Sequence, residues 1–270
     1  MSETRLAVGS VTVQRAGGTA TITVDRQEKR NALSREVLDA VSIGLVETAA
    51  DETIKVLIVT GAGRDNFTSG GDLVALAALR TEAEAEAMAR HARGVLDQIR
   101  TFPVPVVAAV NGDALGGGAE LALACDHRVV DRHARMGFVQ GRQAVSTAWG
   151  GGVDLLRTVG PGQGLRLLCT TEMVDHEHGL RIGLYDRVVA PGEALDEAVA
   201  DFVAPLLRQS VAVLRTFKAL TSAARMGSDR SVLEQLELER FRSNWVHPDH
   251  WAALDGFLGR DRRTSEREPS

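Results

Sequence analysis

Cysteine, long apolar runs and an excess of positive charge are scarce in this sequence, and each scarcity excludes a class of protein. Cys125 and Cys169 are the only cysteines, and neither has a partner at metal-ligand spacing, so we expect two reduced, buried thiols. No run of 18 or more apolar residues occurs, which excludes an apolar membrane span. The first ten residues lack an apolar core of signal-peptide length, so a cytoplasmic protein is expected. The formal net charge of -5 disfavours nonspecific nucleic-acid binding.

What the sequence does contain is an ordinary globular mixture, with 44% apolar and 25% charged residues in a chain of 270. That length fits one large domain, or a main domain with a helical annex. Predicted strands and helices alternate along most of the chain, which indicates an α/β fold with most strands near-parallel. The end of the chain is predicted to be helical only. We therefore expect a core over residues 1–205 and a C-terminal helical region over residues 206–270.

Local patterns predict the individual elements. Gly17 and Gly18 separate two alternating stretches that indicate a hairpin. Ser34 is expected to cap a helix, and Ser231 with Glu234 to form a capping box for another. Further predicted elements are strands over 55–60, 104–110, 128–130 and 135–138, a helix over 81–100, and a helical stripe of Leu195, Val199, Phe202 and Leu206 that Pro205 kinks or ends.

Two glycine-rich segments, each after a predicted strand, are the most informative feature. The first is Ser69-Gly70-Gly71-Asp72-Leu73, and the second includes Gly116-Gly117-Gly118-Ala119-Glu120. Neither fits the dinucleotide-binding or P-loop pattern. Consecutive glycines at a strand-to-helix junction lose conformational entropy on folding, so they indicate positive φ or a ligand touching backbone. Two such segments suggest that two backbone N–H groups meet at one oxygen atom.

With Asn31-Ala32-Leu33-Ser34 and Ala124-Cys125-Asp126, these segments resemble the crotonase (enoyl-CoA hydratase/isomerase) superfamily, in order from about Val11 to Arg260. The resemblance implies a spiral of ββα units and a C-terminal helical region that assembles a homotrimer, or a hexamer of paired trimers. It implies an acyl-CoA thioester substrate, with coenzyme A as part of the substrate, no separate cofactor and no metal.

Residue by residue, the resemblance places the oxyanion hole at the N–H groups of Gly71 and Gly117. It places the acyl-CoA site at the positions Arg30, Ala32, Leu33, Ser69, Asp72 and Leu73, with Lys218 as a candidate basic residue from the C-terminal helices. Asp72 is more readily explained as a brace of its turn than as a substrate contact. The expected intermediate is a thioester enolate.

Glu120 matches the first glutamate of the family's hydratases, but the second falls at Gln140, which cannot carry a proton in that role. Together with Phe138-Val139-Gln140, Trp149-Gly150-Gly151 and Asn244-Trp245, this resembles the ethylmalonyl-CoA decarboxylase branch. We therefore predict a lyase that decarboxylates ethylmalonyl- or methylmalonyl-CoA. Two alternatives stay open: an enoyl-CoA hydratase or isomerase in which Glu120 acts alone, and a non-catalytic acyl-CoA-binding homologue. Trp149 is predicted to be either a pocket wall or core.

Overall fold

The computed structural model describes residues 4–265, and the chain divides into two compact units whose boundary lies between Arg208 and Gln209. Most of the secondary structure, including every strand of the described residues, belongs to the first unit. The division predicted after residue 205 falls just before this boundary, and the roles assigned to the two parts stay predictions.

Two sheets form the first unit. Strands β1 to β3 run antiparallel, and every later neighbour in the larger sheet is parallel, as are all strands of the smaller one. The sequence prediction of mostly parallel strands is therefore confirmed. The seven-stranded sheet has the order β1 (Thr4–Val8), β2 (Val11–Ala16), β3 (Thr19–Val24), β4 (Val56–Gly61), β6 (Val106–Val110), β8 (His127–Val130), β10 (Arg187–Val188), and the three-stranded sheet β5 (Asn66–Thr68), β7 (Asp113–Leu115), β9 (Met136–Gly137).

The chain alternates between the two sheets in repeating ββα units. In each unit one strand joins the large sheet, the next joins the small sheet, and a helix follows. The three units are β4–β5 with α2 (Leu73–Leu76) and α3 (Glu82–Arg100), β6–β7 with α4 (Gly117–Ala124), and β8–β9 with η2 (Val139–Gln143) and α5 (Gly151–Val159). Because the strands of the small sheet are parallel, the segments that follow them leave from the same edge.

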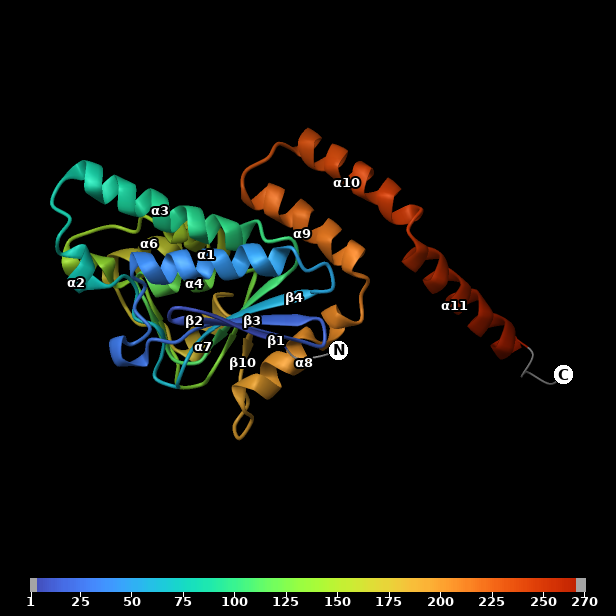
Figure 1. Ribbon diagram of the computed structural model, residues 1–270, viewed down its shortest axis with the longest axis horizontal. Helices are drawn as coiled ribbons and strands as arrows, with labels where there is room; N and C mark the ends of the chain where they lie inside the picture. The colour runs from blue at the N-terminus through green and yellow to red at the C-terminus, as the bar shows by residue number, and fades with distance from the viewer. Residues whose placement is uncertain (1–3, 266–270) are drawn as a thin grey trace. The chain divides into compact units, whose positions relative to one another are not determined.

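Helices cover both faces of the large sheet. On one face α1 (Arg35–Ala49) packs against β2 and β3 and lies beside α3, while α8 (Leu195–Leu207) covers the other face (Figure 1). The predicted cap of α1 is confirmed, because the Ser34 hydroxyl accepts from the Val37 N–H. At α3, Thr81 and Glu84 form a capping box. Pro205 lies inside α8, which ends two residues later.

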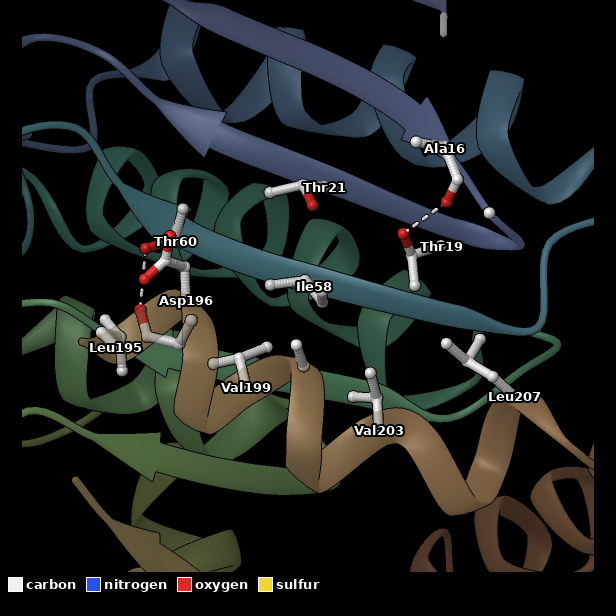
Figure 2. Close-up of a pocket in the computed structure, with 13 residues that line it drawn as sticks. Ala16, Thr19, Thr21, Ile58, Thr60, Leu195, Asp196, Val199, Val203 and Leu207 are labelled. Atoms are coloured by element: carbon white, nitrogen blue, oxygen red, sulfur yellow. Dashed lines mark hydrogen bonds between the residues drawn. The ribbon is translucent and has the colours of Figure 1, made fainter. Parts of the chain in front are cut away.

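Between α8 and the outer face of β3 and β4 runs an apolar groove of about 470 Å³ (Figure 2). Ile58 and Thr60 reach it from β4, and Val199 and Val203 from α8. Alternate residues of a strand point to opposite faces, so these side chains face away from the side that α1 covers. The groove is therefore separate from the glycine segments.

Two buried asparagines fix the loop that leads into β5. The Asn31 amide donates to the carbonyls of Ala62 and Asn66, and its oxygen accepts from the Arg26 N–H. The Asn111 amide donates to the Gly63 carbonyl, and its oxygen accepts from the Gly61 N–H. Buried backbone groups that lack a ladder partner need such side-chain partners. These amides thereby set where the first glycine segment begins.

The second unit consists of helices in its described part, namely α9 (Val211–Arg225), α10 (Arg230–Trp245) and α11 (Pro248–Ser265). The Asn244 amide donates to the Thr216 hydroxyl and ties α10 to α9. The predicted capping box of Ser231 and Glu234 is wrong. Asp229 is the N-cap residue, so Ser231 lies inside the helix, and Glu234 pairs with Arg230 one turn earlier instead.

The expectation that both cysteines are buried is wrong for Cys169. Cys125 is buried as predicted, but Cys169 is exposed near the end of α6. A helical residue is buried only if its face of the helix packs on the core, and composition does not reveal that face. No helix of residues 4–265 is long and apolar enough to cross a membrane. The first unit also contains the short helices η1 (Gln27–Lys29), α6 (Pro161–Thr170) and α7 (His176–Arg181).

Candidate active site

The two glycine segments meet at the edge of the small sheet. Leu33 and Gly71 form a parallel bridge, in which the Leu33 N–H donates to the Gly70 carbonyl over 2.8 Å. Gly70 has a φ of +93°, and a Cβ there would lie 2.6 Å from the Leu115 carbonyl oxygen and 3.1 Å from the Gly117 nitrogen. The chain therefore requires glycine at position 70 both for its backbone conformation and for the close approach of the second segment.

The N–H groups of Gly71 and Gly117 have no protein acceptor in the described part of the chain. Gly117 is the first residue of α4, where the helix itself supplies no acceptor and the helix dipole favours negative charge. The arrangement matches the pair of donors expected at a thioester oxygen, and the role of the two glycines stays a prediction.

The Trp149 ring packs against both of these glycines. A Cβ on Gly117 would lie 2.3 Å from the ring, and one on Gly71 would lie 3.7 Å from it. Trp149 is 6% exposed and also lines a cavity that adjoins Gly71. The sequence allowed either a pocket wall or a core residue, and Trp149 is both.

Glu120 is buried on α4, with only 2% of its surface exposed. Its Oε2 accepts from the N–H groups of Trp149 and Gly151 over 2.8 and 2.9 Å, and its Oε1 accepts from the Gln140 amide over 2.9 Å. A Cβ on Gly151 would lie 2.4 Å from the Glu120 Cγ, so only glycine lets this segment approach so closely. Glu120 and Gln140, which the sequence singled out, are in direct contact.

Burial raises the pKa of Glu120 above its usual value of 4.5, because the carboxylate loses its hydration. The backbone N–H groups of Gly151, Trp149 and Ala148 and the positive charge of Arg100 oppose this rise without cancelling it. An acid with a raised pKa can serve as a proton donor nearer to neutral pH than an exposed glutamate.

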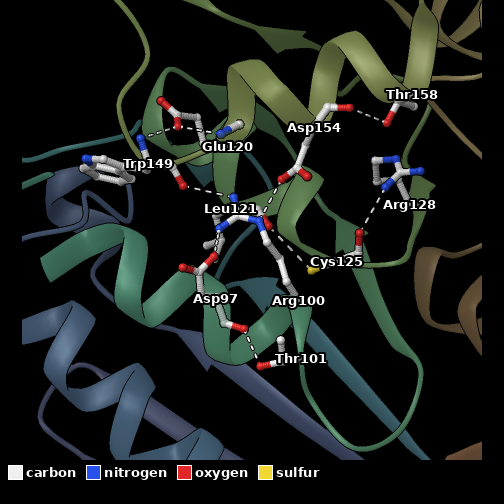
Figure 3. Close-up of polar contacts among 11 residues, drawn as sticks. Asp97, Arg100, Thr101, Glu120, Leu121, Cys125, Arg128, Trp149, Asp154 and Thr158 are labelled. Carbon is white, nitrogen blue, oxygen red and sulfur yellow. Dashed lines mark hydrogen bonds and ion pairs between the residues drawn. The ribbon is translucent and has the colours of Figure 1, made fainter. Parts of the chain in front are cut away.

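A network of charged residues supports the segment that surrounds Glu120 (Figure 3). Arg100, which is 4% exposed, donates to Asp154 over 2.9 Å, to Asp97 over 2.7 Å and to the Trp149 carbonyl over 3.0 Å. Gly150 has a φ of +93°, and a Cβ there would lie 2.8 Å from the guanidinium. Asp97 lies on α3 with Arg100, whereas Asp154 lies on α5 and Trp149 just before it. The network therefore joins α3 to the start of α5.

The cavity beside Gly71 has a volume of about 270 Å³ and mostly apolar walls. Leu33 and Leu38, with Leu76 and Met88, contribute to them. Its two carboxylates are engaged elsewhere: Asp72 caps α2 and pairs with Arg26 over 2.7 Å, and Glu84 completes the cap of α3. The walls suit an apolar group, and the Trp149 ring lies between this cavity and the two glycines.

The remaining predicted site residues surround the first glycine segment. Ala32 and Leu33 are buried, whereas Arg30 and Leu73 are exposed. The Arg30 carbonyl accepts from the Ser69 N–H, which places both residues at one rim of the segment. Asp72 braces the turn through Arg26. Lys218 is buried on α9 in the second unit, and its contribution to a coenzyme A path stays a prediction.

Sequence reasoning missed the network behind Glu120 and the cavity walls. In the sequence, Arg100 is only the last residue of a predicted helix, and Asp154 belongs to no motif. A charged side chain in a predicted helix is usually exposed, so nothing marks these two as buried. The glycine directly after Trp149 is a partial signal, because Gly150 approaches the Arg100 guanidinium too closely for a side chain. No group of three or more potential metal ligands occurs in the described chain.

Comparisons with known proteins agree with this geometry. The family model described as enoyl-CoA hydratase/isomerase matches residues 14–260. A crotonyl-CoA hydratase of Syntrophomonas wolfei is 29% identical over 94% of this chain and 96% of its own. An ethylmalonyl-CoA decarboxylase of Rattus norvegicus is 31% identical over 84% of this chain and 79% of its own. The structure of Pseudomonas aeruginosa DspI superposes with a TM-score of 0.86 at 33% identity and 96% coverage of both chains.

The matched region contains both sheets apart from β1 and the start of β2, and it includes both glycine segments and Glu120. The predicted crotonase resemblance and the mixed α/β fold are thereby confirmed, and relatives of more than one activity share them. The chain belongs to the enoyl-CoA hydratase/isomerase family.

Proposed function

We propose that this protein decarboxylates an alkylmalonyl-CoA thioester, with ethylmalonyl-CoA or methylmalonyl-CoA as substrate. The observation that carries the proposal is the contact between Glu120 and Gln140 over 2.9 Å. An amide stands where a second acid would complete a pair for water addition. The similarity to ethylmalonyl-CoA decarboxylases of Rattus norvegicus and Danio rerio, 31% and 32% identical, supports it.

Electrostatics favour a neutral residue at position 140. A malonyl-type thioester brings its own carboxylate, and a second fixed carboxylate 4 Å away would repel it by about 4 kcal/mol at an effective dielectric of about 20. Gln140 removes that repulsion. The burial that raises the pKa of Glu120 acts in the same direction, because it disfavours the charged form of that residue.

The proposed reaction proceeds in two steps. The bond from the α-carbon to the carboxylate breaks, carbon dioxide leaves, and the electron pair moves onto the thioester oxygen as an enolate. The N–H groups of Gly71 and Gly117 stabilise that oxygen more strongly than the neutral carbonyl. The α-carbon then takes a proton from Glu120, which regains one from solvent. The alkyl branch occupies the apolar cavity beside Gly71. Besides the coenzyme A of the substrate, the proposed reaction uses no cofactor.

Incubation with ethylmalonyl-CoA, methylmalonyl-CoA and crotonyl-CoA tests the proposal. Carbon dioxide should be released from at least one malonyl-type ester, faster than crotonyl-CoA is hydrated. Gln140→Glu should lower carbon dioxide release at least tenfold, because it restores the repulsion. Gln143→Glu is the matched control, since it adds the same charge at an exposed position of η2. Rapid hydration of crotonyl-CoA with no carbon dioxide from either ester would overturn the proposal.

A second candidate is an enoyl-CoA hydratase or isomerase in which Glu120 acts alone. It is favoured by the Gln140 Oε1, which is buried without a hydrogen-bond donor in the described part of the chain. Glu120 Oε1 accepts a hydrogen bond from the Gln140 amide and has a further lone pair, so one water can bind to both oxygens. General acid–base help is worth about 10²–10⁴ in rate, so this hydration should be slow. On this alternative, Gln140→Glu would raise hydration instead of lowering turnover.

We also propose that the protein assembles as a homotrimer, or as a hexamer of paired trimers, through its C-terminal helices. The apolar side chains exposed on α10 and α11 support this assembly.

A further inference from the structure

The segment 148–151 is held from two opposite sides. On one side the N–H groups of Trp149 and Gly151 donate to the Glu120 carboxylate. On the other side, two arginines of α3 donate to consecutive carbonyls: Arg93 to that of Ala148 over 2.8 Å, and Arg100 to that of Trp149 over 3.0 Å. The arginines lie seven residues apart, which is about two turns and places them on one helix face.

Arg93 and Glu120 bind opposite ends of one peptide group, the one between Ala148 and Trp149. The Ala148 carbonyl and the Trp149 N–H belong to the same planar group, and in a trans peptide they point in opposite directions. Arg93 therefore fixes the carbonyl end of the group whose N–H end binds Glu120. Arg100 fixes the next peptide, and its side chain is itself held by Asp97 and Asp154.

From this geometry we infer that Arg93 and Arg100 are positioning residues for the backbone donors of Glu120. Arg93 holds the peptide whose N–H is the Trp149 donor, and Arg100 holds the following peptide, which links Trp149 to the Gly151 donor. They act through the peptide groups, without touching the substrate. The inference rests on the proposed role of Glu120, but not on which thioester reacts. It assigns α3 a function beyond packing, namely setting how readily the buried carboxylate ionises.

The expected sign follows from the chemistry. Hydrogen bonds to a carboxylate favour its charged form, so loosening these donors should raise the pKa of Glu120 further. The neutral Gln140 amide is the contact from η2. The elements around Glu120 carry further charged or titratable groups. They are Glu82, Glu84, Glu86, Arg90, His91, Arg93, Asp97 and Arg100 on α3, Asp154 and Arg157 on α5, Asp113 on β7, His127 and Arg128 on β8, and Arg142 on η2.

The test titrates Glu120 directly, by carbon NMR of the full chain labelled at the glutamate carboxyl carbon. Glu120→Gln identifies the signal. Arg93→Gln is the main variant, because Arg93 is exposed and its loss should leave the fold intact. Arg90→Gln is its matched control, since Arg90 is exposed on the same helix and pairs with Glu86 instead. Arg100→Lys is matched by Arg128→Lys, another buried arginine paired with a carboxylate.

The ionisation constant of Glu120 should fall about threefold in Arg93→Gln and about tenfold in Arg100→Lys, with the controls near wild type. A Glu120 titration unchanged in Arg93→Gln, or shifted equally by Arg90→Gln, would overturn the inference. If Arg100→Lys does not fold, the Arg93 and Arg90 pair still decides. Carbon dioxide release from ethylmalonyl-CoA, followed against pH in parallel, separates the two proposals: without turnover the proposed function fails, while the titration still tests the arginines.

Discussion

Glu120 is a titratable group in the interior whose protonation depends on residues from three other parts of the chain. Burial works against its charged form, while the Trp149 and Gly151 N–H groups and the Gln140 amide work in favour of it. Burial prevails, so the pKa is raised. A glutamate with three donors would be ionised at low pH if it were exposed, so the cost of burial decides its chemistry.

The raised pKa of Glu120 makes stability depend on pH with a definite sign. Above the unfolded value of about 4.5 the unfolded chain loses its proton first, so the folded state binds more protons and the free energy of unfolding falls as pH rises toward the folded pKa. Glu120→Gln removes this pH-dependent contribution to the free energy of unfolding, because glutamine does not titrate. Relative to wild type, the variant should therefore gain stability as pH rises from about 4.5 toward the folded-state pKa, by about 1.4 kcal/mol per unit of pKa difference.

Urea unfolding of both proteins at several pH values measures this difference, and their other titrating groups cancel in the comparison. A variant that loses stability relative to wild type as pH rises would mean that the folded-state pKa of Glu120 is lowered, against the balance described above.

Site residues that belong to a recognisable sequence pattern could be predicted, and site residues outside any pattern could not. Gly71, Gly117, Glu120 and Gln140 could be singled out because runs of glycine and an aligned motif mark them. Arg100 and Asp154 carry no local mark, because their burial results from contacts between residues 54 positions apart. Trp149 was noticed, but its backbone contacts with Glu120 could not be read from its side chain.

Among the elements, the small sheet brings the site together. The first glycine segment, the second glycine segment and Gln140 directly follow β5, β7 and β9, three parallel neighbours. Strands of two or three residues have too little periodicity to be predicted, so the sequence predicts no strand at β5 or β7. The longer strands β3, β4 and β6 and the helices α1 and α3 could be predicted, because each has a clear apolar pattern and a start signal.

Two helical glycines of this unit should respond oppositely to alanine. Gly94 lies within α3 and a Cβ there would meet nothing within 4 Å, whereas at Gly118 in α4 it would lie 2.3 Å from the Thr68 carbonyl oxygen. Gly94→Ala should stabilise the protein by about 0.5–1 kcal/mol, because alanine loses less entropy in a helix. Gly118→Ala should destabilise it by about 1–3 kcal/mol through overpacking.

Thermal unfolding of the two variants beside wild type measures both effects. Equal tolerance of alanine at both positions would contradict the close approach of α4 to β5 on which the second glycine segment depends.

On the scale of the whole molecule, the two units differ in how they bury apolar side chains. The first unit has a continuous core, whereas no residue of α10 is buried. A helix without a buried face gains little from packing and is marginal by itself in water. Its exposed apolar residues cluster with those of α11, since Phe241, Trp245 and Trp251 lie in ring contact. Composition predicted helices here but could not show that they lack a partner within their own chain.

In the proposed assembly, a second copy of the chain covers the exposed apolar side chains of α10 and α11. Phe241 is 55% exposed, Trp245 49%, Trp251 45% and Phe257 58%, on a surface far more apolar than scattered single residues would make. Sedimentation equilibrium at micromolar concentration should give three or six times the chain mass of 28.9 kDa. Trp245→Glu should shift the protein toward smaller species, because it would place a charge in the contact, whereas Glu237→Gln, at an exposed position on the same helix, should leave the mass unchanged. A single species of 28.9 kDa for wild type would contradict the assembly and leave these side chains in need of a different partner.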